Sequence, residues 1–340
     1  MKFVKLVFSI IFSFILLFSN SSLEAAVEEQ INLYISGPKE MAKLLEAEFE
    51  KEYGDVLNVY HSGSGPLRQK VWTEMLAGSI QADIVWGAEP MMYQALKEKG
   101  VLLRYRPPMI QDLKKEYIYG DGYFTAVNAR YGVIVYNKER VLTDEIPTGW
   151  ADLLDRRWHQ RLGIADASQS STALAITSGL YQLFDYSWIL YRALGENEVM
   201  LTKQNIDVVS KIETAELDLG IAPHDGVLRL INKAKKRGIE SPLGIIWPVE
   251  GIISIQRPIA IIKKERSLEA DNLVKKFVDF SLSETGQNIA TRFGFITVRN
   301  GLKLPEGVPQ TIEVSSLDWK YASKHQEEIR ATFKEIMFTD

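Results

Sequence analysis

The segment Ile31-Asn-Leu-Tyr-Ile-Ser-Gly-Pro38 is an apolar, β-branched run that closes on Ser-Gly-Pro and leads into an amphipathic stretch. The run predicts a strand that ends at Ser36. A helix is predicted over 39–53, because apolar residues recur on one helical face, namely Met41, Leu44, Leu45 and Phe49. Backbone N–H groups at a helix start favour anions, so this loop can receive a negatively charged group.

The same strand-loop-helix unit recurs along the chain. A second strand is predicted over 57–61, followed by the loop Ser62-Gly-Ser-Gly65, and a third over 82–86 ends at Gly87. Later strands are predicted over 132–137, 161–165, 218–222, 244–247 and 251–261. This alternation is typical of an α/β fold with a parallel sheet, and ligands in such sheets bind beyond the carboxyl ends of the strands. We therefore predict two α/β lobes that share a ligand cleft.

The N-terminus has the features of a secretory signal. Lys2 and Lys5 precede an apolar run over 6–18, and the small residues Ala25 and Ala26 follow. A membrane-spanning helix needs about 20 apolar residues, which favours cleavage near Ala25 or Ala26 over an uncleaved anchor. We expect a protein secreted into a periplasm.

Composition excludes several classes of function. The 340 residues include 46% hydrophobic and 25% charged residues, with a net charge of −4. So mild a charge does not suggest a nucleic-acid surface. The chain has no cysteine, which excludes disulfides, thiolate metal sites and thiol catalysis.

Three helix starts are rich in hydroxyl groups. Ser36 follows the first strand, Ser62 and Ser64 follow the second, and the segment 166–172 contains Ser170, Ser171 and Thr172. One such start is an ordinary helix cap. Three of them suggest a ligand with phosphate, phosphonate or carboxylate oxygens.

A second set of candidates would accept hydrogen bonds. His224-Asp225-Gly226 follows a predicted strand, and Glu250 lies in the loop Trp247-Pro-Val-Glu-Gly251. Asp225 is also a plausible helix cap, and His224 and Glu250 are plausible turn residues. If the three meet in one cleft, the carboxylates can accept hydrogen bonds from sugar hydroxyls.

Catalysis has less support in the sequence. There is no Gly-x-Ser-x-Gly elbow, no His-Glu-x-x-His pair and no Walker A loop, and the four histidines lack metal-ligand spacing. We expect a protein that is not an enzyme and carries no cofactor or resident metal, with a secreted hydrolase of phosphorylated solutes as the alternative from another class.

Several segments resemble the periplasmic solute-binding proteins of ABC transporters, in the group called ferric-iron-binding-like or extracellular solute-binding family 1. The matching stretches are 33–38, 82–88, 130–137, 146–154, 247–251 and 257–261. The resemblance implies a type II binding-protein fold, with one lobe formed by 27–129 and about 258–305 and the other by 130–257 and about 306–340. It also implies a small anionic ligand, an inner-membrane ABC permease or a sensor kinase as partner, and a monomer.

Ferric-binding members of this group use adjacent tyrosines after the strand that corresponds to 219–223. This chain has His224-Asp225 there and no Tyr-Tyr pair. Members that bind hexose phosphates are more similar, because they carry a His-Asp pair and a downstream glutamate, which Glu250 matches. The resemblance therefore implies a hexose phosphate held by Ser36, Ser62, Ser64, Ser170, Ser171, Thr172, His224, Asp225 and Glu250, with Gly87 at the third strand end. Ferric iron and other organophosphates or phosphonates are the alternatives.

Overall fold

The computed structural model describes residues 29–88, 90–315 and 317–338. The predicted signal segment lies outside the described residues. The strands are β1 (Ile31–Ser36), β2 (Leu57–Ser62), β3 (Ile84–Trp86), β4 (Thr125–Asn137), β5 (Leu162–Ala165), β6 (Met200–Thr202), β7 (Leu219–Pro223), β8 (Leu243–Ile246), β9 (Ile253–Ile261) and β10 (Ile296–Thr297). The α-helices are α2 (Lys39–Tyr53), α3 (Ser64–Leu76), α4 (Pro90–Glu98), α5 (Ser171–Leu183), α6 (Ile189–Glu196), α7 (Asn205–Glu213), α8 (His224–Lys236), α9 (Leu268–Leu282), α10 (Glu284–Arg292), α11 (Trp319–Lys324) and α12 (Gln326–Phe338).

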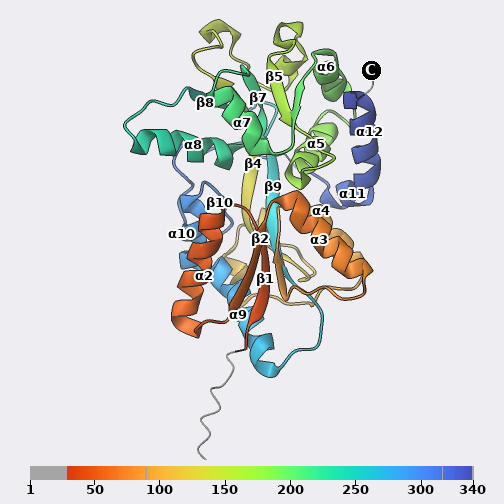
Figure 1. Ribbon diagram of the computed structural model, residues 1–340, viewed down its shortest axis with the longest axis vertical. Coiled ribbons are helices and arrows are strands. Elements are labelled where there is room, and N and C mark those ends of the chain that lie inside the picture. Colours follow the sequence, from red (N-terminus) through yellow and green to blue (C-terminus); the bar gives the residue numbers. More distant parts are fainter. Residues whose placement is uncertain (1–28, 89, 316, 339–340) are drawn as a thin grey trace, which may run out of the picture.

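Short 3-10 helices complete the described elements: η1 (Pro108–Asp112), η2 (Lys115–Tyr117), η3 (Thr143–Glu145), η4 (Ala151–Leu154) and η5 (Arg156–Trp158). The main path of the sheet runs β2-β1-β3-β9-β4-β7-β5-β6, with β8 and β10 also paired to β4. Neighbours pair in parallel at both ends of this path, whereas β9 and β4 are antiparallel to each other and to their outer neighbours. These two strands run through the centre of the molecule from one half to the other (Figure 1).

The apolar core is divided between the two halves. One cluster joins β1, the first part of β4, α9 and α10. A second cluster joins the last part of β4 with β5, β7, α5 and α12. β4 is buried along nearly its whole length and supplies residues to both clusters, as expected for a strand covered on both faces. Its polar residues, among them Asn128 and Arg130, are therefore buried or half-buried as well. The residue boundaries predicted for the two lobes stay a prediction.

Local predictions hold best for the first unit, where β1 and α2 have the predicted ends. Two later segments differ. The sequence predicts a helix that starts at Val227 after a loop at His224-Asp225-Gly226, but His224 and Asp225 already form the first turn of α8. The amphipathic pattern over about 317–337 predicts one helix, but the structure has two, α11 and α12, which meet at His325.

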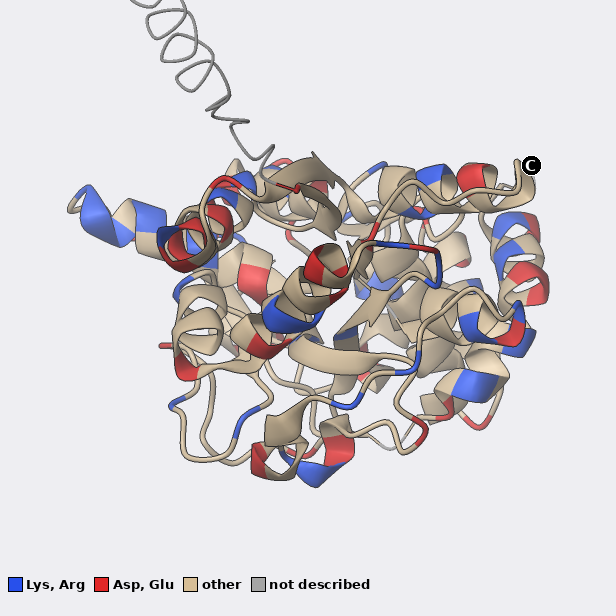
Figure 2. Cartoon of the chain, turned by 90° about the horizontal axis from the view of Figure 1, so that it is seen from below, with Lys and Arg blue, Asp and Glu red and all other residues tan. Residues whose placement is uncertain are grey.

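Basic and acidic residues are interspersed along the helices and loops (Figure 2). The last turn of α8 is a local exception, because it carries Lys233, Lys235 and Lys236, which complement the negative end of the helix dipole. In the described part of the chain, no helix combines the length and apolar character needed to cross a membrane.

Candidate ligand-binding cavity

A cavity of about 730 Å³ lies between the two halves, within the size range of small-molecule sites. Five helices contribute residues at or just before their first turn: α2, α3, α5, α7 and α8. Each helix start presents unpaired backbone N–H groups and the positive end of a dipole. Their convergence makes the cavity suited to an anion.

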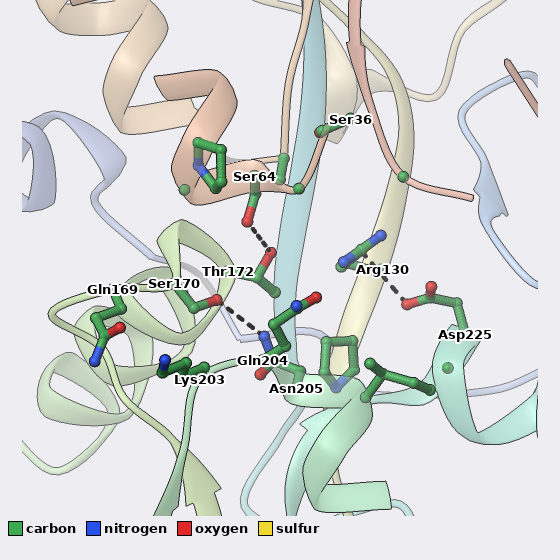
Figure 3. Close-up of a pocket in the computed structure, with 18 of the residues that line it drawn as sticks. Ser36, Ser64, Arg130, Gln169, Ser170, Thr172, Lys203, Gln204, Asn205 and Asp225 are labelled. Atoms are coloured by element: carbon green, nitrogen blue, oxygen red, sulfur yellow. Dashed lines mark hydrogen bonds and ion pairs between the residues drawn. The ribbon is translucent and has the colours of Figure 1, made fainter. Parts of the chain in front are cut away.

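On one side of the cavity the two halves touch, and we call this the contact side: Ser64, Gly65, Gln169, Ser170 and Thr172. Thr172 Oγ1 donates to Ser64 Oγ at 3.5 Å, which joins α5 to α3 (Figure 3). A Cβ atom on Gly65 would lie only 2.3 Å from the Gln169 carbonyl oxygen. A glycine is therefore needed at position 65 for this approach of the two backbones.

The loop before α5 is held in place by buried polar groups. Asp166 accepts hydrogen bonds from the Ser168 backbone N–H and the Gln169 side-chain amide, both at 2.7 Å. Arg330, on α12, donates to the Ala167 and Ser168 carbonyls. Ser170 caps α5 by accepting from the Ala173 N–H at 3.2 Å, and it also accepts from the Asn205 amide at 3.1 Å.

Figure 3 shows Ser36, Arg130 and Asp225 across the cavity from the contact side. With Arg229, which also lines the cavity and pairs with Asp225, they form what we call the arginine side. Asp225 is 1% exposed and lies 3.4 Å from Arg130 Nε and 2.6 Å from Arg229 Nη1. Burial alone would raise the pKa of Asp225, but the two arginines lower it below its usual value. Asp225 therefore remains a carboxylate throughout the physiological range.

Ser36 ends β1 without capping α2. The cap position of that helix is Pro38, and no side chain bonds to the helix start. Ser36 is 1% exposed, and its Oγ has no hydrogen-bond partner among the described residues. A buried hydroxyl without a partner is costly, so it is a good candidate for contact with a bound molecule.

Arg257, on β9, lies behind Ser36 and is fully buried. It donates to the Ser36 carbonyl and, at 3.0 Å, to Asn128 Oδ1. The guanidinium lies 4.4 Å from the centre of the Phe295 ring, and that of Arg130 lies 5.0 Å from the same ring. Burial, with Arg130 nearby, lowers the pKa of Arg257 to about 9, so the buried side chain still carries its charge near pH 7.

His224 is part of the core and does not line the cavity. Its Nδ1 accepts from the Tyr131 backbone N–H at 2.9 Å. Burial lowers the pKa of His224 to about 4, so its imidazole is neutral at pH 7. Its position fits a role in fixing α8 to β4.

Glu250 also lies outside the cavity lining. Its carboxylate accepts from the Trp150 and Ala151 backbone N–H groups at 3.0 and 2.8 Å, and so caps η4. The structure therefore does not bring His224, Asp225 and Glu250 into one cleft. Of the three, Asp225 alone lines the cavity.

Of the other residues predicted to bind the ligand, some line the cavity and some do not. Ser36, Ser64, Ser170 and Thr172 line the cavity, whereas Ser62, Gly87 and Ser171 do not. The Ser62 hydroxyl donates to the Gly63 carbonyl, and the Gly87 N–H is bonded to the Pro258 carbonyl and the Tyr93 hydroxyl. Ser171 is buried in α5.

The basic residues that line the cavity were not among those predicted from the sequence. Arg68, Arg130, Lys203 and Arg229 line the cavity, and among the described lining residues Asp225 is the single carboxylate. Each cation stands near a predicted loop or strand end, but the sequence contains 40 lysines and arginines, and nothing local separates these four from the rest.

Within the described ranges, no group of three or more histidines and carboxylates is placed to hold a metal ion. No described tyrosine lines the cavity either. Ferric iron is a hard cation that needs oxygen anions, and a wall with four cations and one carboxylate is poorly suited to it.

Solved structures with the same architecture support the two-lobed prediction. The periplasmic binding protein AfuA from Actinobacillus pleuropneumoniae, solved with fructose 6-phosphate, has a TM-score of 0.78 and 24% identity, covering 92% of this chain and 99% of that one. Iron-bound HitA from Pseudomonas aeruginosa has a TM-score of 0.77 and 19% identity over 90% of this chain and 99% of that one. The ferric binding protein from Campylobacter jejuni has a TM-score of 0.77 and 18% identity over the same shares. At such identities the likeness establishes the fold alone, which is the predicted α/β, type II two-lobed fold.

A search of curated protein sequences finds no match to this chain. The family profile of bacterial extracellular solute-binding proteins matches residues 79–325, well over half of the chain. The match includes residues of both core clusters and most of the cavity lining, and it confirms the predicted superfamily. This chain is therefore a member of the bacterial extracellular solute-binding protein family.

Proposed function

We propose that this protein is the periplasmic receptor of an ABC importer and that it carries a hexose phosphate to the permease. The observation that carries the proposal is the cavity wall, where four cationic side chains and five helix starts face one carboxylate among the described residues. Such a wall selects an anion, and phosphate oxygens are well matched to guanidinium groups and helix N-termini.

The ligand contacts we propose are Ser36, Ser64, Ser170, Thr172 and Asp225, joined by Arg68 and Arg130. The uncharged part of the ligand needs both donors and acceptors, as sugar hydroxyls do. Asp225 Oδ1 is buried without a hydrogen bond, and Asn205 Oδ1 is in the same state. Both can accept from hydroxyl groups.

The AfuA structure was solved with fructose 6-phosphate, which agrees with this ligand class. HitA was solved with iron, and the cavity chemistry here disfavours that cargo. Ferric iron thus becomes the alternative that the same experiment tests.

Calorimetric titration of the metal-stripped mature protein tests the proposal. We expect saturable binding of glucose 6-phosphate and no saturable heat with glucose or ferric citrate. Binding of ferric citrate alone would overturn the ligand class. Recovery of the sugar phosphate unchanged after long incubation is expected of a receptor, whereas release of inorganic phosphate would indicate a hydrolase.

Arg68 offers a variant with a matched control. Arg68 lines the cavity and its Nε is buried without a partner, whereas Arg192 is exposed on α6, outside the cavity. Hydrogen bonds to a charged group are worth about 1.5–3 kcal/mol, so Arg68→Ala should weaken binding about 10- to 150-fold. Arg192→Ala removes the same charge and should leave the affinity unchanged.

Export is part of the proposal. The family is described as extracellular, and the signal features of residues 1–26 agree with it. Mass spectrometry of the protein from a periplasmic extract should give a mature N-terminus at Ala26 or Val27. An intact N-terminus in the membrane fraction would contradict cleavage.

A further inference from the structure

The arginine side carries more positive charge than its own residues neutralise. Arg130 and Arg229 flank Asp225, and Arg257 lies behind Ser36 with no ion pair among the described residues. Together with Arg257 behind them, these residues number three cations and one carboxylate, an excess of two positive charges; Arg257 is fully buried and the Arg130 side chain is 11% exposed, whereas the Arg229 side chain is 32% exposed. Buried charge without compensation is costly, so a structure that keeps it gains from a ligand that supplies the opposite charge.

Sheet register explains why these charges lie together. Asn128 on β4 is opposite Arg257 on β9, and Arg130 is two residues further along β4. Side chains two residues apart share one face of a sheet, so Arg130 and Arg257 are diagonal neighbours on the same face. Phe295 lies against both guanidinium groups and keeps them from folding away.

Two donors on this side lack hydrogen-bond partners. Ser36 Oγ is buried and bonds to no described residue, and Arg130 Nε is within 3.4 Å of Asp225 but forms no hydrogen bond with it. Both residues line the cavity. An acceptor-rich, doubly charged group placed between them would satisfy both donors and offset the excess charge.

We infer that the phosphate of the ligand binds on the arginine side, between Ser36 and Arg130, as a phosphomonoester dianion. This inference rests on the proposed function and narrows it in two ways. It places the phosphate away from the serines and threonine of the contact side, which are left for the sugar. It also makes a doubly charged ester a requirement, because a phosphomonoester carries about −1.5 to −2 charges at pH 7 whereas a sulfate ester carries about −1.

Titration of wild type and four single variants with glucose 6-phosphate and glucose 6-sulfate tests the inference. The variants are Ser36→Ala, Arg130→Gln, Thr172→Val and, as the control, Ser171→Ala. Ser36 and Ser171 are both buried with partnerless hydroxyls, but Ser171 lies outside the cavity lining. Neither alanine change removes an internal hydrogen bond, so both proteins should fold as wild type does.

We expect Ser36→Ala to weaken glucose 6-phosphate binding about 10- to 100-fold, and Arg130→Gln to weaken it at least as much. Ser171→Ala should bind as wild type, and Thr172→Val should lose less than Ser36→Ala. Wild type should bind the sulfate at least about tenfold more weakly than the phosphate, and Arg130→Gln should narrow that difference.

Wild-type affinity in Ser36→Ala together with a large loss in Thr172→Val would overturn the inference and move the phosphate to the contact side. Equal binding of sulfate and phosphate by wild type would overturn the requirement for a dianion. Failure of wild type to bind glucose 6-phosphate at all would refute the proposed function itself. Should Arg130→Gln fail to fold, Ser36→Ala still decides the position of the phosphate.

Discussion

The two sides of the cavity are built differently. The arginine side is formed by the end of β1, the middle of β4 and the first two turns of α8, and its charged groups are paired with one another around the buried Asp225. On the contact side, loops and helix starts from the two halves of the molecule touch at Ser64, Gly65, Gln169 and Thr172. The first side combines residues of the central sheet with α8, whereas the second is made of loops and helix starts alone.

Because the two sides are built differently, substitutions on them should have different effects on ligand affinity and on closure of the two halves. Changes on the arginine side should alter folding stability and ligand charge recognition together, because the same groups carry both. Changes on the contact side should alter the ease with which the halves meet while leaving each core intact. Four predictions test this division, and they run from the largest expected effect to the smallest.

Asp225→Asn should be the most damaging substitution. It leaves Arg130 and Arg257 buried with no carboxylate nearby among the described residues, and breaking a buried ion pair costs about 3–5 kcal/mol. Urea denaturation should show this loss in the free energy of unfolding. Asp155→Asn is the control, because its pair with Arg157 is exposed to solvent and its loss should leave the free energy of unfolding nearly unchanged. Equal losses of unfolding free energy in the two variants would show that burial does not increase the contribution of these ion pairs to stability.

Acid should weaken the fold through His224. Its folded pKa of about 4 lies below the usual value of 6.5, so the unfolded chain binds the proton more readily. The stability is complete above pH 6.5 and falls as the pH drops towards 4, by about 3 kcal/mol in total. Urea denaturation at pH 7, 5.5 and 4 measures this fall. In His224→Gln the free energy of unfolding should change less between pH 7 and pH 4. If it falls as steeply as in wild type, other groups are responsible for the acid sensitivity.

Gly65→Ala should impair closure with little effect on the free energy of unfolding. The new Cβ would lie 2.3 Å from the Gln169 carbonyl oxygen, and such overlaps cost about 1–3 kcal/mol, which corresponds to about a 5- to 150-fold loss of affinity. Gly63→Ala is a matched control, because its Cβ would meet Pro66 Cδ at an ordinary 3.6 Å. Small-angle scattering with and without ligand should show compaction in the control but not in Gly65→Ala. Full compaction in both would mean that this contact does not limit closure.

Glu250→Gln should have the smallest effect, and on stability alone. Its carboxylate caps η4 through two backbone N–H groups, and loss of such a cap costs about 0.5–2 kcal/mol. Because Glu250 is outside both sides of the cavity, glucose 6-phosphate affinity should not change. A large loss of affinity at unchanged melting temperature would indicate that Glu250 contacts the ligand, as predicted from the sequence.

Much of the fold could be predicted from sequence because its strand-loop-helix units are local. The apolar run that ends at Ser36 and the helical face with Met41 and Phe49 define β1 and α2 with the ends that the structure has. The hydroxyl-rich helix starts were visible for the same reason. Of the predicted contacts, Ser36, Ser64, Ser170, Thr172 and Asp225 do line one cavity.

Charge pairing could not be predicted in this way. Arg130 reads as one residue of a strand, and its approach to Asp225 depends on the pairing of β4 with β7 and on α8 starting at His224. His224 and Glu250 carry the right chemistry for a site, but their partners are backbone groups far away in sequence. Whether a polar residue meets a ligand or a backbone group is decided by tertiary packing, which no local pattern encodes.

The antiparallel pairing of β4 with β9 has a consequence for the order of synthesis. Residues near 130 in β4 find their partners near 255 in β9, and β3 also needs β9 on its other edge. The sheet therefore cannot close until more than three quarters of the chain has been made, and contacts so distant in sequence slow folding. Until then the nascent chain lacks its complete central sheet, a state compatible with an export machinery that threads unfolded polypeptides.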